Sequence, residues 1–509
     1  MPQMMENKEK EETAQAEDVS TGDSFDMQHI GSTRGRRKFS SLQLIGSAYT
    51  VTNSWLGVAG AFTTGITAAG SASIIYGLLL MFTVNLFVGI ALSELISAMP
   101  NSGGQYYWVM RLAPKRYARG LSYMTGICNL FAAYCVTASS SIAVSSWVFG
   151  SAKLVYPDLA VNAWRIYLGA VGLNIIAAIV NLWQQVVSRS ISIGLWLSLL
   201  VCISITIALP TASHDHTGIK FIFASLQNNS GWSSNAMAFI VGLINPNFAF
   251  AALDSATHLA EETPDPARNV PKAILFTVVI GFITSFPFAC MLMYTLTDLT
   301  AVINTPTGVP LVELFRIAFR SDSAALATLS IVTVTYFFSL LPQQAYQARL
   351  CWAFSRDQGL PFSHLWSQVH PTSHVPLHAH LLCVCIVCLF GLLYIASTTA
   401  FNSLITGVIT FPYLTYLAPC ILSLVRGDEQ PRGPFNAGRL GILSKIITVA
   451  CCLFAIIMYS FPYQVPVTTS NMNYITAIYG VALVFGTVDW LFRARFEFAF
   501  DSGGVDHTQ

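Results

Sequence analysis

The chain is dominated by apolar runs long enough to cross a lipid bilayer, and this feature restricts its possible folds more than any other. A membrane-spanning helix needs roughly 20 mostly apolar residues. Hydrophobic residues make up 54% of the 509 positions and charged residues only 10%, whereas a typical soluble domain carries about 25% charge. Because so few charges cannot coat a soluble particle of this size, we expect lipid to cover most of the surface.

Polar punctuation divides the chain into candidate spans, which predict an all-α integral membrane protein with about twelve transmembrane helices. Their approximate bounds are 43–68, 73–97, 121–149, 164–183, 190–210, 235–257, 272–296, 324–348, 377–397, 401–425, 443–461 and 475–492. Runs of helix length can satisfy all of their own backbone hydrogen bonds inside lipid.

The distribution of Lys and Arg predicts the orientation of these spans. With the N-terminus placed inside the cell, 21 of the 26 Lys and Arg residues fall in inner segments and 5 in outer loops. Such a bias follows the positive-inside rule, so both termini are expected to be cytoplasmic. A possible glycosylation acceptor, Asn228-Asn229-Ser230, falls in the outer loop 211–234.

The two ends of the chain differ in composition from the spans. Residues 1–40 are charged and lack the apolar core of a secretory signal peptide, so we expect a disordered cytoplasmic tail there. Residues 496–509 are expected to form a short cytoplasmic tail, with the membrane domain covering 41–495. The net charge of +1 gives no reason to expect a nucleic acid partner.

Two of the spans, the first and the sixth, are poor continuous helices. Span one contains Ser54-Trp55-Leu56-Gly57-Val58-Ala59-Gly60, and span six contains Gly242-Leu243-Ile244-Asn245-Pro246-Asn247-Phe248. Pro246 has no N–H for a helical hydrogen bond. Inside a membrane, such interruptions are tolerated where the backbone lines a cavity or is buried in protein.

The two interrupted spans lie five spans apart, which is the pattern of an inverted-repeat transporter with its site at the breaks. We therefore expect one repeat over 41–210, a second over 235–425, and extra helices over 443–492. Half-helix N–H groups there can bind a carboxylate, and freed carbonyl groups can face an ammonium. The residues expected to bind substrate are Ser54, Gly57, Val58, Ala59, Gly60, Asn245, Asn247, Phe248, Ala249, Phe250 and Tyr336. An aromatic such as Phe248 suits a cation, although packing is an equally good explanation.

Several ordered motifs add a separate argument. They are Asn53-Ser54-Trp55 with the glycines after it; Glu94 followed by the run Met99–Trp108; the run Phe250–Ile274, with His258-Leu259-Ala260-Glu261-Glu262 inside it; the run Ala353–Pro361; Gly433-Pro434-Phe435; and Asn471-Met472-Asn473-Tyr474. Together they resemble the amino acid–polyamine–organocation permeases, in the fungal branch of GABA, amino acid and choline permeases. The resemblance runs from about residue 38 to 495.

The resemblance implies a LeuT-like fold and proton- or gradient-driven uptake of an amino acid, GABA, choline or a polyamine. It leaves the choice among these substrates open. The chain departs from the family at Ala252, where glycine is usual, and at this position we expect the span-six helix to approach its neighbours less closely.

Five ionisable residues are candidates for coupling or gating: Asp254, Glu94, Glu261, Arg268 and Arg356. An acid within a span is costly and often functional, yet Asp254 and Glu94 could equally be structural groups near the inner ends of their spans. Glu261 is expected to form an ion pair with Arg268 or Arg356. A proton completes the set of expected partners, beside the amine or amino acid and the bilayer.

Enzymatic and metal-binding functions find little support. The His258–Glu262 segment lacks the second histidine of a zinc pair, and Cys383, Cys385 and Cys388 do not share one helix face. Nucleotide and hydrolase motifs are also missing, so we expect neither a cofactor nor an enzyme. The sequence thus predicts a plasma-membrane secondary transporter that imports an amino acid or related amine. The alternative is a nutrient sensor of the same fold that does not transport.

Overall fold

The computed structural model describes residues 40–371, 373, 375–469 and 471–499, and in these residues all regular structure is helical. The predicted disordered tail lies, up to residue 39, outside the described residues, as do residues 500–509 of the predicted C-terminal tail. Eleven segments of the described chain are long and apolar enough to cross a membrane. This confirms the prediction of an all-helical, multi-span membrane protein.

The helices follow the predicted spans closely, with interruptions in two of them. The bounds are α2 (Ser41–Thr52), α3 (Ser54–Gly60), α4 (Phe62–Ala98), α5 (Gln105–Leu112), α6 (Lys115–Val155), α7 (Ala163–Val180), α8 (Gln184–Ala212), α9 (Ile219–Ala224), α10 (Asn235–Gly242), α11 (Ile244–Phe248), η1 (Leu253–Glu262), α12 (Pro266–Thr295), α13 (Leu299–Ile303), α14 (Pro310–Phe319), α15 (Asp322–Arg356), α16 (Ser363–Trp366), α17 (Leu377–Ala396), α18 (Thr398–Arg426), η2 (Gly427–Glu429), α19 (Arg439–Met458), α20 (Ile475–Asp489), η3 (Trp490–Ala494) and α21 (Arg495–Glu497).

The first predicted span, 43–68, accounts for the difference between twelve expected spans and eleven long helices. It is divided into α2, α3 and the first turns of α4, so none of its pieces alone is long enough to cross a membrane. α4 itself changes direction at Ala69 and Gly70, where the backbone is not helical.

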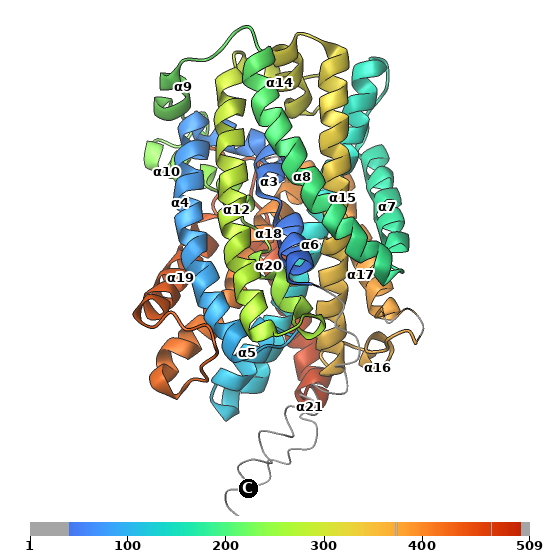
Figure 1. The fold of residues 1–509 in the computed structure, drawn as a ribbon, viewed down its shortest axis with the longest axis vertical. Coiled ribbons are helices and arrows are strands. Elements are labelled where there is room, and N and C mark those ends of the chain that lie inside the picture. Colours follow the sequence, from blue (N-terminus) through green and yellow to red (C-terminus); the bar gives the residue numbers. More distant parts are fainter. Residues whose placement is uncertain (1–39, 372, 374, 470, 500–509) are drawn as a thin grey trace, which may run out of the picture.

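The connecting segments gather at two opposite ends of the molecule. α5, α16 and α21 lie at one end, and α9 and α14 lie at the other (Figure 1). The first group belongs to the segments predicted to be cytoplasmic and the second to the outer loops, so the structure separates the two groups as alternating spans require.

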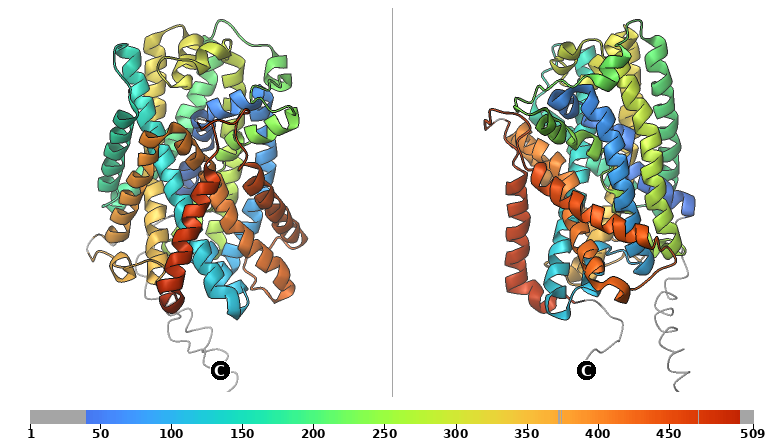
Figure 2. Two further views of the ribbon diagram at one scale, coloured as in Figure 1. Left: turned by 180° about the vertical axis from the view of Figure 1, so that it is seen from behind. Right: turned by 90° about the vertical axis from the view of Figure 1, so that its left-hand side faces the viewer.

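The helices differ in how deeply they lie in the bundle. In α6 the most apolar stretch is 83% buried, whereas in the segment Ile475–Glu497 the corresponding figure is 17%. Both views in Figure 2 show α20 on the outside of the bundle. Its exposed side chains are apolar, for example Val481 and Val484. We therefore regard α6 as a central helix and α20 as a peripheral one whose outer face contacts lipid.

The described C-terminal segment is anchored to the end of the bundle that carries α5 and α16. The Tyr123 hydroxyl donates to Asp489 Oδ2 at 2.6 Å, and Arg493 pairs with the same carboxylate. Further along, Arg119 donates twice to the Phe498 carbonyl, at 2.9 and 2.7 Å, and the Phe498 ring is fully buried. Ordered packing therefore continues to Phe498, and Asp489 serves an interface.

A buried ion pair joins α4 to α19. Lys445 Nζ lies 2.9 Å from Glu94 Oε2, with 3% and 11% of the two side chains exposed. The other oxygen of Glu94 accepts the Ala437 N–H at 2.7 Å. Because breaking such a pair leaves an uncompensated buried charge, it fastens the extra helix to the bundle.

Replacing Lys445 by Met is expected to destabilise the protein by about 3–5 kcal/mol, since Glu94 would remain buried without its partner. The melting temperature of purified protein would show the loss. Glu94→Gln combined with Lys445→Met should recover much of it. The matched control is Arg432→Met, which removes an exposed pair with Asp428 and should cost less than about 1 kcal/mol. Equal losses of melting temperature in Lys445→Met and Arg432→Met would contradict this role of the buried pair.

Candidate functional site

The break in span one is held open by an asparagine. Asn53 separates α2 from α3 in the left-handed conformation, with φ 37°. Its side chain donates to Ser339 Oγ at 3.1 Å and accepts from Ser198 Oγ at 3.0 Å, and Ser198 in turn accepts the Trp55 indole N–H. Asparagine tolerates this backbone region better than most residues, so the sequence and two neighbouring helices, α8 and α15, favour the same interruption.

The break in span six lies slightly later than the sequence indicated. α10 and α11 run almost continuously past Pro246 to Phe248, and the chain turns over residues 249–252 before η1 begins. Ala252 is left-handed there, with φ 56°. A left-handed alanine costs about 1–2 kcal/mol, which glycine would not. Ala252 therefore occupies a position that favours glycine because of its backbone conformation. This reason is separate from the looser approach to neighbouring helices that we expected there from the sequence.

The structure brings the two breaks into direct contact. An added Cβ on Gly57 would lie 2.9 Å from the Ala249 Cα, so only glycine permits this approach. Asn245 donates from Nδ2 to the Val58 carbonyl at 3.3 Å, which links the two segments by a hydrogen bond. α4 fits beside them because Gly77 faces the Pro246 ring, where a Cβ would lie 2.6 Å from Cγ.

Some polar atoms at the breaks have no hydrogen-bond partner among the described residues. These include Asn245 Oδ1 and Ser54 Oγ, both on fully buried side chains. Buried polar groups nearly always have a partner, so Asn245 Oδ1 is a candidate for contact with a solute. Ser54 Oγ instead packs against α12, because a Cβ on Gly281 would lie 2.3 Å from it. The predicted residues Val58 and Ala59 offer only small apolar side chains and their backbone.

Asn247 differs from Asn245 because the protein itself satisfies its amide. Tyr413 donates to Oδ1 at 2.8 Å, Asn85 donates to the same atom at 3.5 Å, and Nδ2 donates to the Tyr459 hydroxyl at 3.2 Å. Tyr459 follows α19, one of the extra helices. We therefore assign Asn247 to holding the break in position against α4, α18 and α19.

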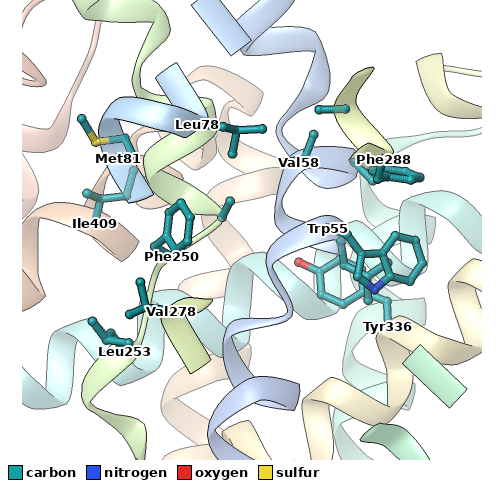
Figure 3. Packing of buried hydrophobic residues seen from close by; sticks show 14 of the residues in the cluster. Trp55, Val58, Leu78, Met81, Phe250, Leu253, Val278, Phe288, Tyr336 and Ile409 are labelled. Atoms are coloured by element: carbon teal, nitrogen blue, oxygen red, sulfur yellow. The ribbon is translucent and has the colours of Figure 1, made fainter. Parts of the chain in front are cut away.

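Aromatic side chains lie on either side of the breaks. Figure 3 shows Trp55, Phe288 and Tyr336 on one side and Phe250 with Leu253 on the other. The Tyr336 hydroxyl donates to Ser140 Oγ at 3.4 Å, and Phe250 is buried within the apolar core. Gly60 is exposed, and a Cβ there would meet only the Tyr336 ring and hydroxyl, at 3.9 Å. Open space at the end of α3 is thus bordered by an aromatic ring.

Glu261 and Arg356, two of the five predicted coupling or gating residues, form an ion pair, and an unpredicted pair of Glu262 with Arg349 also joins η1 to α15. Arg356 forms two hydrogen bonds with Glu261, at 3.0 and 3.2 Å, and Arg349 forms two with Glu262, at 2.7 and 3.1 Å. These pairs join η1 to α15. Arg268, the other partner proposed for Glu261, instead faces Asp265 at 3.8 Å on the surface.

Glu94 also lies apart from the η1 pairs, because it is committed to Lys445. Beside it, near η2 and the start of α19, is a cavity of about 320 Å³ whose lining includes Arg432 and Asn436. The structure therefore does not bring Glu94 to the two breaks.

Asp254 is the centre of a buried polar cluster just beyond the span-six break. Gln105 donates to its Oδ2 at 2.6 Å, and Asn129 donates to Gln105 Oε1 at 3.1 Å. His258 Nε2 lies 3.5 Å from the same carboxylate oxygen. His258 was not among the predicted site residues, although its spacing of four residues from Asp254 on a helix could have indicated this contact.

No metal centre is evident in the part of the chain that the structure describes, since it contains no cluster of three or more His, Cys, Asp or Glu side chains. Both glutamates of the His258–Glu262 segment pair with arginines. Cys383 is buried against Tyr134 and Gln347, whereas Cys385 is exposed on another face of α17.

Comparisons with known proteins agree on one class. The model of a family described as amino acid permease matches residues 42–483. A choline transporter of Saccharomyces cerevisiae is 37% identical over 92% of this chain and 83% of its own length. A swainsonine transporter of Arthroderma benhamiae is 36% identical over 90% and 91%, and an amino-acid permease of Arabidopsis thaliana 28% over 90% and 92%.

Gly60→Leu is expected to abolish solute uptake while leaving the amount of protein at the membrane nearly unchanged, because the new side chain enters the open space beside Tyr336. Gly60→Ala should retain most of the uptake. Gly57→Ala is the contrasting variant: its Cβ would collide with the Ala249 backbone and should lower both uptake and melting temperature. Uptake of labelled solutes, normalised to surface protein, is measured for all three variants. The melting temperature of the purified protein is measured for Gly57→Ala. Normal uptake by Gly60→Leu would remove this end of α3 from the site.

Proposed function

The chain belongs to the amino acid permease family and functions in membrane transport, and from this premise we propose that it imports an amino acid or a related amine by alternating access. The proposed solute is an amino acid, GABA, choline or a polyamine. We further propose that the two interrupted spans belong to corresponding halves, 41–210 and 235–425, and that the solute binds where they meet.

The contact between the two breaks is the observation that carries this proposal. Asn245 bridges them with one hydrogen bond from its amide nitrogen, while its Oδ1, an acceptor, has no partner among the residues that the structure describes. An ammonium or amine is a donor and would satisfy it. Tyr336 supplies a ring beside Gly60 that suits a cationic group. No acid or base occurs among residues 53–60 and 243–252, so selectivity there would depend on hydrogen bonds and aromatic surface.

The ion pairs between η1 and α15 support a gate at the end of the bundle that carries α5 and α16. Four charged side chains form two ion pairs there, and both pairs join a segment of span six to span eight. Since alternating access requires one end to open while the other closes, we propose that these pairs separate when solute is released. With the predicted topology this end is cytoplasmic, and the termini are cytoplasmic as well.

Coupling to a proton gradient across the plasma membrane is the energy source that we propose. The family resemblance favours a gradient-driven permease, and similarity to a yeast choline transporter favours transport over nutrient sensing. Asp254 is the buried acid nearest to the span-six break, which supports a role for it in coupling.

Uptake of labelled choline, GABA, leucine and putrescine into cells lacking their own carriers is the direct test. We expect at least one of the four to accumulate against its gradient, and the other three to compete with it to different degrees. Binding of a solute without any flux would support the sensor instead. Neither flux nor thermal stabilisation of the purified protein by any of the four would contradict the permease proposal.

Reversing the charge of one gate residue tests the η1–α15 pairs. Arg356→Glu places two acids together and should lower uptake about fivefold, because about 1 kcal/mol of pairing in the closed state is lost. Glu261→Arg combined with Arg356→Glu should restore much of the uptake. Arg268→Glu is the matched control, since its partner Asp265 is exposed and distant at 3.8 Å. A gate role is wrong if the double variant transports no better than Arg356→Glu.

A further inference from the structure

His258 is held between a carbonyl and a carboxylate. The side chain is 1% exposed. Its Nδ1 lies 2.9 Å from the Ser102 carbonyl oxygen, and its Nε2 lies 3.5 Å from Asp254 Oδ2. Asp254 and His258 both lie on η1, four residues apart.

These contacts determine where protons must be. A carbonyl oxygen only accepts, so Nδ1 carries a hydrogen and donates it to Ser102. A neutral imidazole would then present the lone pair of Nε2 to the carboxylate, which is repulsive. The approach of Nε2 to Asp254 is attractive only when one further proton sits on the pair, on Nε2 or on the carboxyl group. The structure thus contains a position for a single shared proton.

The side chains that contact the pair carry no positive charge, so the shared proton sets the net charge of this site. Gln105 of α5 donates to Asp254, Tyr416 of α18 lies within hydrogen-bonding reach of the carboxylate, and the ring of Tyr346 of α15 stacks on His258 with centroids 6.1 Å apart. None of these three is a cation.

The charged side chains packed around η1 are engaged elsewhere. The pairs and contacts are Arg349 with Glu262, Arg356 with Glu261, Glu94 of α4 with Lys445, and Arg268 of α12 with Asp265; Lys272 of α12 is exposed, and Tyr49 of α2 donates to Thr284.

We infer that the Asp254–His258 pair is the binding site of the proton that is transported together with the solute; this inference rests on the proton-coupled import proposed above. A hydronium ion on the outer side gives up one proton and becomes water, and an N–H or O–H bond forms on the pair. On the cytoplasmic side that bond breaks, and a water molecule accepts the proton as hydronium.

The position of the pair links this proton to the gate. η1 carries Asp254 and His258 near its start and Glu261 and Glu262 at its end. With the proton, the buried pair is neutral overall; without it, a carboxylate remains buried against a lone pair, which is costly. Loss of the proton therefore destabilises the closed position of η1 and favours separation of its glutamates from Arg349 and Arg356. Proton release and opening on the cytoplasmic side occur together.

The test uses full-length protein in proteoliposomes, with labelled choline, GABA, leucine and putrescine supplied one at a time. For a solute carried with one proton, an imposed gradient of one pH unit should drive about tenfold accumulation by the wild type. His258→Gln keeps a donor and an acceptor but cannot bind the extra proton. It should show about onefold accumulation, no solute-dependent proton entry measured with an internal pH dye, and solute exchange at equal concentrations within about twofold of wild type.

Asp254→Asn should behave in the same way and guards against a folding defect in His258→Gln, because the exchange reaction reports a folded carrier. The matched control is His380→Gln. His380 is equally buried, but its Nε2 faces the Ala178 carbonyl at 3.4 Å instead of an acid. It should retain both the pH-driven accumulation and the proton entry.

The outcomes separate this inference from the proposed function. pH-driven accumulation by His258→Gln, or wild-type transport without proton entry, overturns the proton site while the permease proposal stands. Absence of both flux and exchange for all four solutes in the wild type overturns the permease proposal, and the proton site with it. If both variants lose solute exchange as well as accumulation, the pair has a structural role, and the proton site is likewise overturned.

Discussion

The structure depends on one constraint, that backbone N–H and C=O groups within a membrane must find partners inside the protein. Long helices meet it by themselves, and most of the chain does so. The interruptions at Asn53 and at residues 249–252 do not, and they exist only because protein surrounds them. Asn53 is held by Ser198 and Ser339 from two other helices, and Asn245 bridges to the Val58 carbonyl.

The interruptions also explain why small residues matter at this centre. Two helices with ordinary side chains pack about 8–10 Å apart, which would keep the breaks from touching. Glycine at position 57 lets α3 reach the Ala249 backbone, and glycine at position 77 receives the Pro246 ring. Close packing and interrupted backbone together create a region with unsatisfied polar atoms, and such a region can hold a polar solute inside a bundle whose outer surface is apolar.

The ionisable side chains of span six all lie on the side of its break that carries η1. η1 carries two glutamates that pair with arginines of α15, and its first turns carry Asp254 next to His258. A short helix that ends at a break can move as a unit, so that a change in charge at one end affects the contacts at the other. This arrangement places the proposed proton site, the proposed gate and the solute site on one continuous segment of about 20 residues, close to the length of a single span.

Local sequence was sufficient to determine the helices, their approximate bounds, the two interrupted spans and the family, because hydrophobic length, Pro, Gly and ordered motifs act within a few residues of one another. Pairing required the tertiary structure. Glu94 and Lys445 are 351 positions apart, Glu261 had two plausible arginine partners, and nothing local indicated that the Ser102 carbonyl would orient His258. The left-handed backbone at Ala252 was also unseen, since alanine gives no sign of it. Which groups meet across the bundle is decided by packing among distant helices, and that packing determines which polar residues are structural and which are available for chemistry.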